Sequence, residues 1–113
     1  MLKQLEWVGS SKKDLLELPE EVRQEIGFAL LVAQYGGTHE SAKLFKGYGS
    51  GIYEIVSNYD TNAYRAIYIV NVNDKVYVLH VFQKKSKRNI KMPREDLVIL
   101  EERLKRVRRL KNE

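Results

Sequence analysis

The residues best suited to chemistry lie where a predicted buried strand runs into a strongly basic segment. Residues 77–82 are apolar, aromatic or β-branched apart from His80, a composition typical of a packed strand. Residues 83–94 then hold six basic side chains and no acidic one. A rigid strand that leads into a cationic loop is a suitable support for groups that bind phosphate. The simpler alternative is a central strand followed by a solvated run of charges.

The charge of the whole chain is uneven, and this asymmetry indicates an anionic partner. The net charge is +5, with four basic and seven acidic residues in positions 1–40 but sixteen basic and eight acidic residues in positions 41–113. Nucleic acid is the commonest partner of such a basic region. Membrane surfaces and acidic proteins have the same charge complementarity.

Length and composition predict a single globular domain over residues 1–113. The chain contains no apolar run near the roughly 20 residues that cross a bilayer, and its N-terminus lacks a signal-peptide core. We therefore expect a cytoplasmic protein without a membrane partner. The absence of cysteine excludes disulfides and thiolate metal sites, and only two histidines, His39 and His80, are present. We expect neither a metal nor a cofactor.

The N-terminal third predicts a short edge strand over residues 2–8 and two helices. The first helix begins at Ser10 or Ser11 and extends to Leu18, and the second begins at Pro19 and ends at Gly36 and Gly37. One apolar stripe of the second helix is formed by Val22, Ile26, Ala29, Leu30 and Ala33. Four further apolar residues widen it and predict burial on much of the circumference: Phe28, Leu31, Val32 and Tyr35. Close packing is the usual reason for a mid-helix glycine such as Gly27.

The rest of the chain predicts a loop, three strands and a final helix. Residues 38–50 form the loop, whose glycines are consistent with a flexible link and do not match a phosphate-binding P-loop. The strands, over 52–57, 64–72 and 75–83, are expected to form an antiparallel meander. From Pro93 onward the pattern is amphipathic, with Leu97, Leu100, Leu104, Val107 and Leu110 on the apolar side. The other side carries Arg103, Lys105, Arg106, Arg108, Arg109 and Lys111.

The register of the predicted sheet brings several polar side chains to one face. If Asn73 and Asp74 form a two-residue turn, Arg65 lies opposite Phe82 and Ile67 opposite His80. Arg65, Ile67, His80, Phe82 and Lys84 then share one face, and Ala66, Tyr68, Val70, Tyr77, Leu79 and Val81 share the other. An even-numbered turn before the middle strand adds Glu54 to the Arg65 face.

This combination of side chains suits cleavage of an RNA phosphodiester. A 2′-hydroxyl needs a proton acceptor, the five-coordinate phosphorane needs cations, and the leaving oxygen needs a proton donor. A splayed base stacks on an aromatic ring. Each residue also has a structural alternative: Arg65 pairs only with Glu54, His80 is a hydrogen-bonded core histidine, and Phe82 belongs to the core.

Three strand motifs resemble those of the RelE/ParE toxin superfamily, and more narrowly its phage-derived, HigB-like branch. They are Gly51-Ile-Tyr-Glu-Ile55, Tyr64-Arg-Ala-Ile-Tyr68 and Val78-Leu-His-Val-Phe-Gln-Lys-Lys-Ser86. The resemblance covers nearly the whole chain and implies an α+β, RelE-like fold. In that fold, N-terminal helices pack on a small antiparallel sheet with a C-terminal amphipathic helix.

The resemblance also implies the toxin of a type II toxin–antitoxin system. The expected activity is that of a metal-independent endoribonuclease that cleaves mRNA on the translating ribosome. The expected partners are mRNA, the ribosome and a cognate antitoxin of the helix-turn-helix type.

By motif position, the resemblance implies catalytic roles for four residues. Arg65 and Lys84 would act on the scissile phosphate, and His80 or Glu54 would move protons. The residues expected to bind RNA are Lys43, Lys46, Phe82, Lys85, Lys87 and Arg88.

Two other functions remain open from the sequence. One is that of a gyrase-inhibiting, ParE-type toxin, which has the same fold but no nuclease activity. The other is that of a non-catalytic basic module that binds nucleic acid in a salt-sensitive way.

Overall fold

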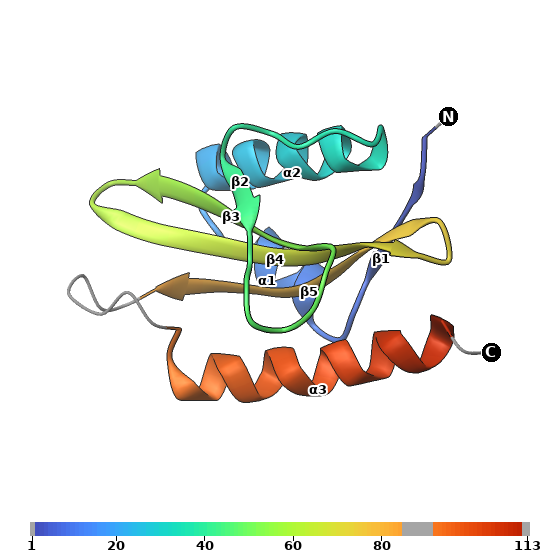
Figure 1. Cartoon of the computed structure of the whole chain (residues 1–113). Coiled ribbons are helices and arrows are strands. Elements are labelled where there is room, and N and C mark those ends of the chain that lie inside the picture. The colour runs from blue at the N-terminus through green and yellow to red at the C-terminus, as the bar shows by residue number, and fades with distance from the viewer. Residues whose placement is uncertain (1, 85–91, 112–113) are drawn as a thin grey trace.

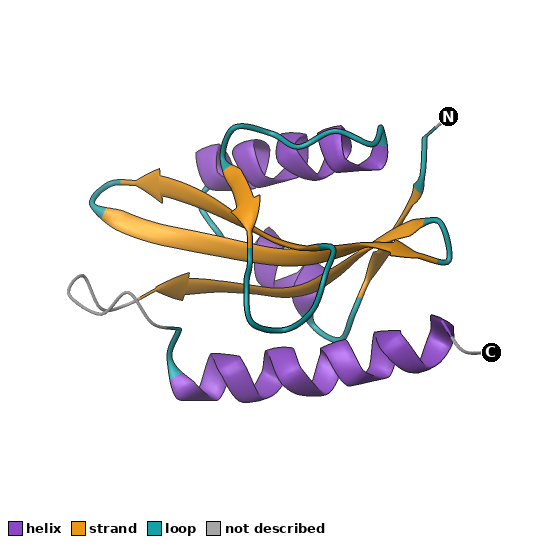
Figure 2. Ribbon diagram, in the orientation of Figure 1, coloured by secondary structure: helices purple, strands orange, loops and turns teal. Residues whose placement is uncertain are grey.

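A five-stranded mixed sheet lies between two helical layers in the computed structural model, which describes residues 2–84 and 92–111 (Figures 1 and 2). The strand order is β1-β5-β4-β3-β2, with β1 parallel to β5 and every other pair antiparallel. Along the chain the elements are β1 (Gln4–Trp7), α1 (Ser11–Leu16), α2 (Glu20–Gln34), β2 (Ala42–Leu44), β3 (Ile52–Tyr59), β4 (Asn62–Val72), β5 (Lys75–Lys84) and α3 (Arg94–Lys111).

The predicted α+β architecture is confirmed, and one strand was missed. All three predicted helices form, as do the edge strand and the three-stranded meander. The segment predicted as a continuous loop over 38–50 contains β2, which pairs with β3 at the sheet edge. At three residues, β2 is too short to show an alternating pattern. None of the helices in the described ranges is long and apolar enough to span a membrane.

The predicted apolar stripe of α2 is the buried one, but the expectation of wider burial was wrong. Val22, Ile26, Ala29, Leu30 and Ala33 are the buried residues of this helix. Three of the four residues predicted to widen the stripe are exposed large hydrophobics: Phe28, Leu31 and Tyr35. The predicted end at the glycine pair is confirmed, because Gly36 has a φ of +91° and the Gly37 amide donates to the Val32 carbonyl at 3.0 Å.

The glycine within α2 also differs from the prediction of close packing. A Cβ at Gly27 would have no heavy atom within 4 Å among the neighbours that the structure describes. Gly27 therefore lies on the open side of the helix, beside Phe28.

Two apolar clusters, one on each face of the sheet, hold the layers together. On the α2 face, Ile26 and Leu30 pack with Ala66, Tyr68 and Val78, and α1 adds Leu15 to the same cluster. On the α3 face the helix contributes Leu100, Leu104 and Val107, which pack against strand residues that include Ile52, Ile67 and Leu79. Figure 1 shows α2 and α3 on opposite sides of the strands.

The predicted register is confirmed at the positions that matter for the site. Asn73 and Asp74 form a two-residue turn with positive φ at both positions, and Val72 pairs with Lys75. Arg65 lies opposite Phe82, and Ile67 lies opposite His80. The turn before β4 is also of even length, because Tyr59 pairs with Asn62.

Between these positions the ladder shifts, and two face assignments were wrong as a result. The shift between Ile67 and Tyr68 leaves Leu79 as an extra residue in β5, and a compensating shift follows Ile69. Tyr77 and Leu79 therefore join the α3-face cluster with Ile67 instead of the Ala66 face. A β-bulge of this kind reverses the alternation of side chains locally.

Candidate active site

The register of four strands brings a row of functional side chains together on the α3 face of the sheet. Lys43 lies opposite Glu54, Glu54 opposite Ile67, and Ile67 opposite His80. Directly opposed residues on neighbouring strands point to the same face, with Cβ atoms about 5 Å apart. The next row contains Arg65 opposite Phe82, and Lys84 follows at the end of β5.

Glu54 and Arg65 form an ion pair at the centre of this surface. The Nη1 atom of Arg65 donates to Oε2 of Glu54 at 2.8 Å, and the two side chains are 20% and 17% exposed. The Nε atom of Arg65 is buried and has no hydrogen-bond acceptor among the residues that the structure describes. The guanidinium thus keeps unused donors while its orientation is held by Glu54.

Lys84 adds a second cation near this pair. Desolvation, and then the charge of Arg65, lower the pKa of Lys84 below the ordinary value of a lysine, while Glu54 opposes the shift. The charges of Lys84, Arg65 and Glu54 therefore interact electrostatically at this point of the sheet. The same three groups can stabilise the charge of a phosphorane and accept a proton from a hydroxyl.

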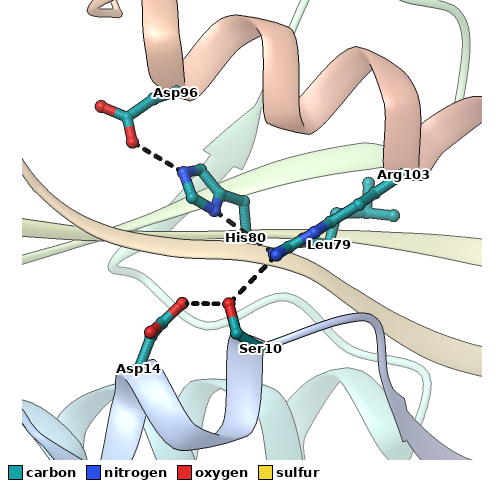
Figure 3. A network of polar contacts seen from close by, with 6 residues as sticks. All are labelled: Ser10, Asp14, Leu79, His80, Asp96 and Arg103. Atoms are coloured by element: carbon teal, nitrogen blue, oxygen red, sulfur yellow. Dashed lines mark hydrogen bonds and ion pairs between the residues drawn. The ribbon is translucent and has the colours of Figure 1, made fainter.

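His80, by contrast, lies beneath α3 in a network of polar contacts, shown in Figure 3. Its Nε2 atom is 2.7 Å from Oδ1 of Asp96, in the first turn of α3, and the side chain is only 5% exposed. Its Nδ1 atom faces Nη1 of Arg103 at 3.5 Å. Because a guanidinium only donates, this arrangement places the ring proton on Nε2, from which it is donated to Asp96.

Arg103 extends the network from α3 across the edge of β5 to α1. It donates from Nη1 to the Leu79 carbonyl and from Nη2 to Oγ of Ser10, both at 3.0 Å (Figure 3). Ser10 in turn donates to Asp14 at 2.8 Å. Gly9 makes this passage possible, because its φ is +57° and a Cβ there would lie 2.8 Å from the guanidinium. The prediction that Arg103 belongs to the solvent face of the helix was therefore wrong.

The other predicted RNA-binding residues are distributed differently. Phe82 is buried and stacks on His80, with ring centroids 4.9 Å apart, so its ring is not presented to solvent. Lys43 and Lys46 are exposed, the first on β2 beside Glu54 and the second in the loop that follows. Lys85, Lys87 and Arg88 lie outside the described residues.

Sequence reasoning missed the two partners of His80, Asp96 and Arg103. Both come from a helix that follows β5, and no local pattern joins them to the strand. One available signal was the position of Arg103, three residues after Leu100 and directly before Leu104, which places it beside the buried stripe of α3. In the described residues, no group of three or more His, Asp or Glu side chains is placed to hold a metal ion.

The model of the phage-derived Gp49-like protein family matches residues 13–105. The chain belongs to this family. Its fold is that of RelE-type toxins, as the sequence motifs predicted. A search of the curated proteins gave no match.

Two solved structures show the likeness in fold. One is a mutant of the E. coli toxin RelE in the free state, with a TM-score of 0.62 and 21% identity over 94% of this chain and 98% of that one. The other is the toxin–antitoxin complex RelBE2 from Mycobacterium tuberculosis, with a TM-score of 0.53 and 16% identity over 74% of this chain and 100% of that one.

Proposed function

We propose that the protein is the toxin of a type II toxin–antitoxin pair and an endoribonuclease that cleaves mRNA on the translating ribosome. The observation that carries the proposal is the group of Glu54, Arg65 and Lys84 on one face of a RelE-type sheet. Neighbouring structures of the same fold are described as toxins, which supports the toxin part.

In the proposed reaction, a 2′-hydroxyl of the RNA attacks the adjacent phosphorus. The carboxylate of Glu54 accepts the hydroxyl proton, and a new O–P bond forms as the bond to the 5′ oxygen breaks. Arg65 and Lys84 bind the phosphate oxygens, where negative charge increases in the transition state. Because the pKa of Lys84 is lowered, its ammonium is a better proton donor to the leaving oxygen than an ordinary lysine would be.

We assign no proton transfer to His80, which was one of the residues implied by the resemblance. Its ring is held by Asp96 beneath α3, and a catalytic role would require this contact to open. Phe82, which stacks on the same ring, is likewise treated as a support for the site.

A cognate antitoxin is the proposed protein partner. The M. tuberculosis neighbour was crystallised as a toxin–antitoxin complex, and the resemblance of the sequence implies a helix-turn-helix protein. Copurification from a strain that expresses both genes would test this partner.

The decisive experiment is induced expression of the wild type beside Arg65→Ala, with growth and mRNA 5′ ends followed together. We expect growth arrest with new ends inside coding regions, and a loss of cleavage of about 100-fold to 1000-fold in the variant. Arg106→Ala is the matched control, because Arg106 pairs only with Glu102 among the described residues and is 53% exposed.

The outcomes separate the three candidate functions. Arrest without new mRNA ends would indicate a gyrase-type target. A folded wild type that causes no arrest would favour a binding module. Unchanged cleavage by Arg65→Ala would remove the proposed site.

A further inference from the structure

A second cationic site lies on the other end of β4 from the proposed active site. A cavity of about 270 Å³ is bordered by Ser50, the β4 residues from Ile69 to Val72, and Arg108 and Lys111 of α3. Asn71 is six residues along β4 from Arg65, which corresponds to about 20 Å of strand. The cavity is therefore separate from the Glu54–Arg65 pair.

The glycine-rich segment before β3 contacts Arg108 and fixes the position of its guanidinium. Its Nη2 atom donates to the Tyr48 carbonyl, in the loop that descends toward α3 in Figure 1. Gly49 has a φ of +106°, and a Cβ at that position would overlap the guanidinium. The glycine thus allows the close approach of Arg108. The contact with Tyr48 holds one edge of the guanidinium, and its other N–H groups make no further hydrogen bond within the described residues.

Two cations of α3, Arg108 and Lys111, line this cavity. Five of the last seven residues of α3 are exposed and basic: Lys105, Arg106, Arg108, Arg109 and Lys111. The negative end of the helix dipole stabilises cations only within the last turn. None of the described residues that line the cavity is acidic, and Ser50 and Asn71 add neutral hydrogen-bond donors.

We propose that this cavity binds a backbone phosphate of the RNA at a distance from the point of cleavage. The inference rests on the proposed function, which supplies RNA as the ligand. A polyanion suits the geometry better than a single ion, because cationic groups lie at both ends of β4 on the side where α3 packs. Phosphate contacts of this kind fix the position of a strand without reading its sequence.

The test measures binding in the absence of cleavage. A single-stranded RNA with 2′-O-methyl groups has no nucleophile, so its dissociation constant can be followed over a range of salt concentrations. Loss of one phosphate contact reduces the magnitude of the slope of the logarithm of the association constant against log[salt] by about 0.7. This change corresponds to about fourfold weaker binding near 0.15 M salt. We expect this change for Lys111→Ala and about fourteenfold weaker binding for Arg108→Ala combined with Lys111→Ala.

The matched control is Lys12→Ala combined with Lys13→Ala, which removes two exposed charges from α1. We expect the control to change the slope far less than the cavity variants. Lys111→Ala is informative by itself, because Arg108→Ala also removes the contact with Tyr48 and can loosen the loop.

Equal slopes for the control and the cavity variants would overturn the proposal. So would binding of inorganic phosphate that is weakened by Lys111→Ala while RNA binding is unchanged in both cavity variants, which would assign the cavity to the free anion. If the predicted slopes are found but the wild type cleaves no mRNA, the cavity stands as an RNA-binding site and the nuclease proposal alone fails.

Discussion

Removal of the Asp96 carboxylate should destabilise the protein through His80. The Asp96→Ala variant leaves the Nε2–H group of a side chain that is 5% exposed without its acceptor at 2.7 Å. An unsatisfied buried donor costs about 1–3 kcal/mol. Loss of an acidic residue from the first turn of α3 costs a further 0.3–1 kcal/mol or so through the helix dipole.

Glu95→Ala is the matched control, because Glu95 lies in the same first turn but is exposed. Both variants lose the dipole contribution, so their difference isolates the contact with His80. We expect Asp96→Ala to be less stable than the control by about 1–3 kcal/mol, or roughly 4–12 °C in Tm for a chain of this length.

Urea unfolding followed by circular dichroism, together with thermal unfolding, measures this difference. The slope of the unfolding free energy against urea should be the same in both variants, because the buried surface is unchanged. A double-mutant cycle with His80→Ala should give a coupling energy between about 0.5 and 3 kcal/mol. Equal midpoints for Asp96→Ala and Glu95→Ala would refute the structural role of His80. Loss of cleavage in a fully stable Asp96→Ala variant would restore a catalytic role for the ring.

Three further predictions concern other parts of the chain. Gly27→Ala should raise the free energy of unfolding by about 0.5–1 kcal/mol, because the added methyl group meets no described neighbour within 4 Å and alanine has the higher helix propensity. Chemical denaturation beside the wild type measures this change, and a lower stability of the variant would contradict it. Burial raises the pKa of Tyr68 to about 12. The contribution of the neutral phenol to the free energy of unfolding should therefore be fully present below pH 10 and should decrease by about 2–3 kcal/mol as the pH rises to 12. Tyr68→Phe should abolish this decrease in alkaline unfolding titrations, and should gain about 1 kcal/mol at neutral pH because the buried hydroxyl has no partner in the described residues. Lys84→Arg should keep RNA binding but lose single-turnover cleavage, because arginine retains the charge and does not release a proton; equal cleavage rates would show that Lys84 is not the donor.

Short-range rules predicted which residues lie opposite one another at Arg65 and Ile67, although they did not predict the bulge between these positions and the turn. The Asn73-Asp74 turn predicts the pairing of Arg65 with Phe82, two residues before Lys84, and this pairing holds because the two shifts in the ladder between β4 and β5 cancel. The buried stripe of α2 followed in the same way from helical spacing.

Features that depend on long-range packing could not be predicted. The bulge at Leu79 changes the face of two strand residues, and no glycine or proline marks it. The contacts of His80 with Asp96 and Arg103 depend on where α3 docks. The exposure of Phe28 and Tyr35 likewise follows from which side of α2 meets the sheet, although apolar composition alone predicted burial.

The parallel pairing of β1 with β5 has a consequence for the order in which the chain becomes ordered during synthesis. Gln4 pairs with Lys75 and Trp7 with Val78, so the first strand of the protein has no partner until the last strand has been made. At about 5–20 residues per second, this wait lasts roughly 4–14 seconds. During that time α2 can meet β3 and then β4 as they are made, but the sheet still lacks β5, which lies between β1 and β4. We therefore expect the nascent chain to remain without its native core, and without the Arg65–Glu54–Lys84 surface, until β5 has left the ribosome that makes it.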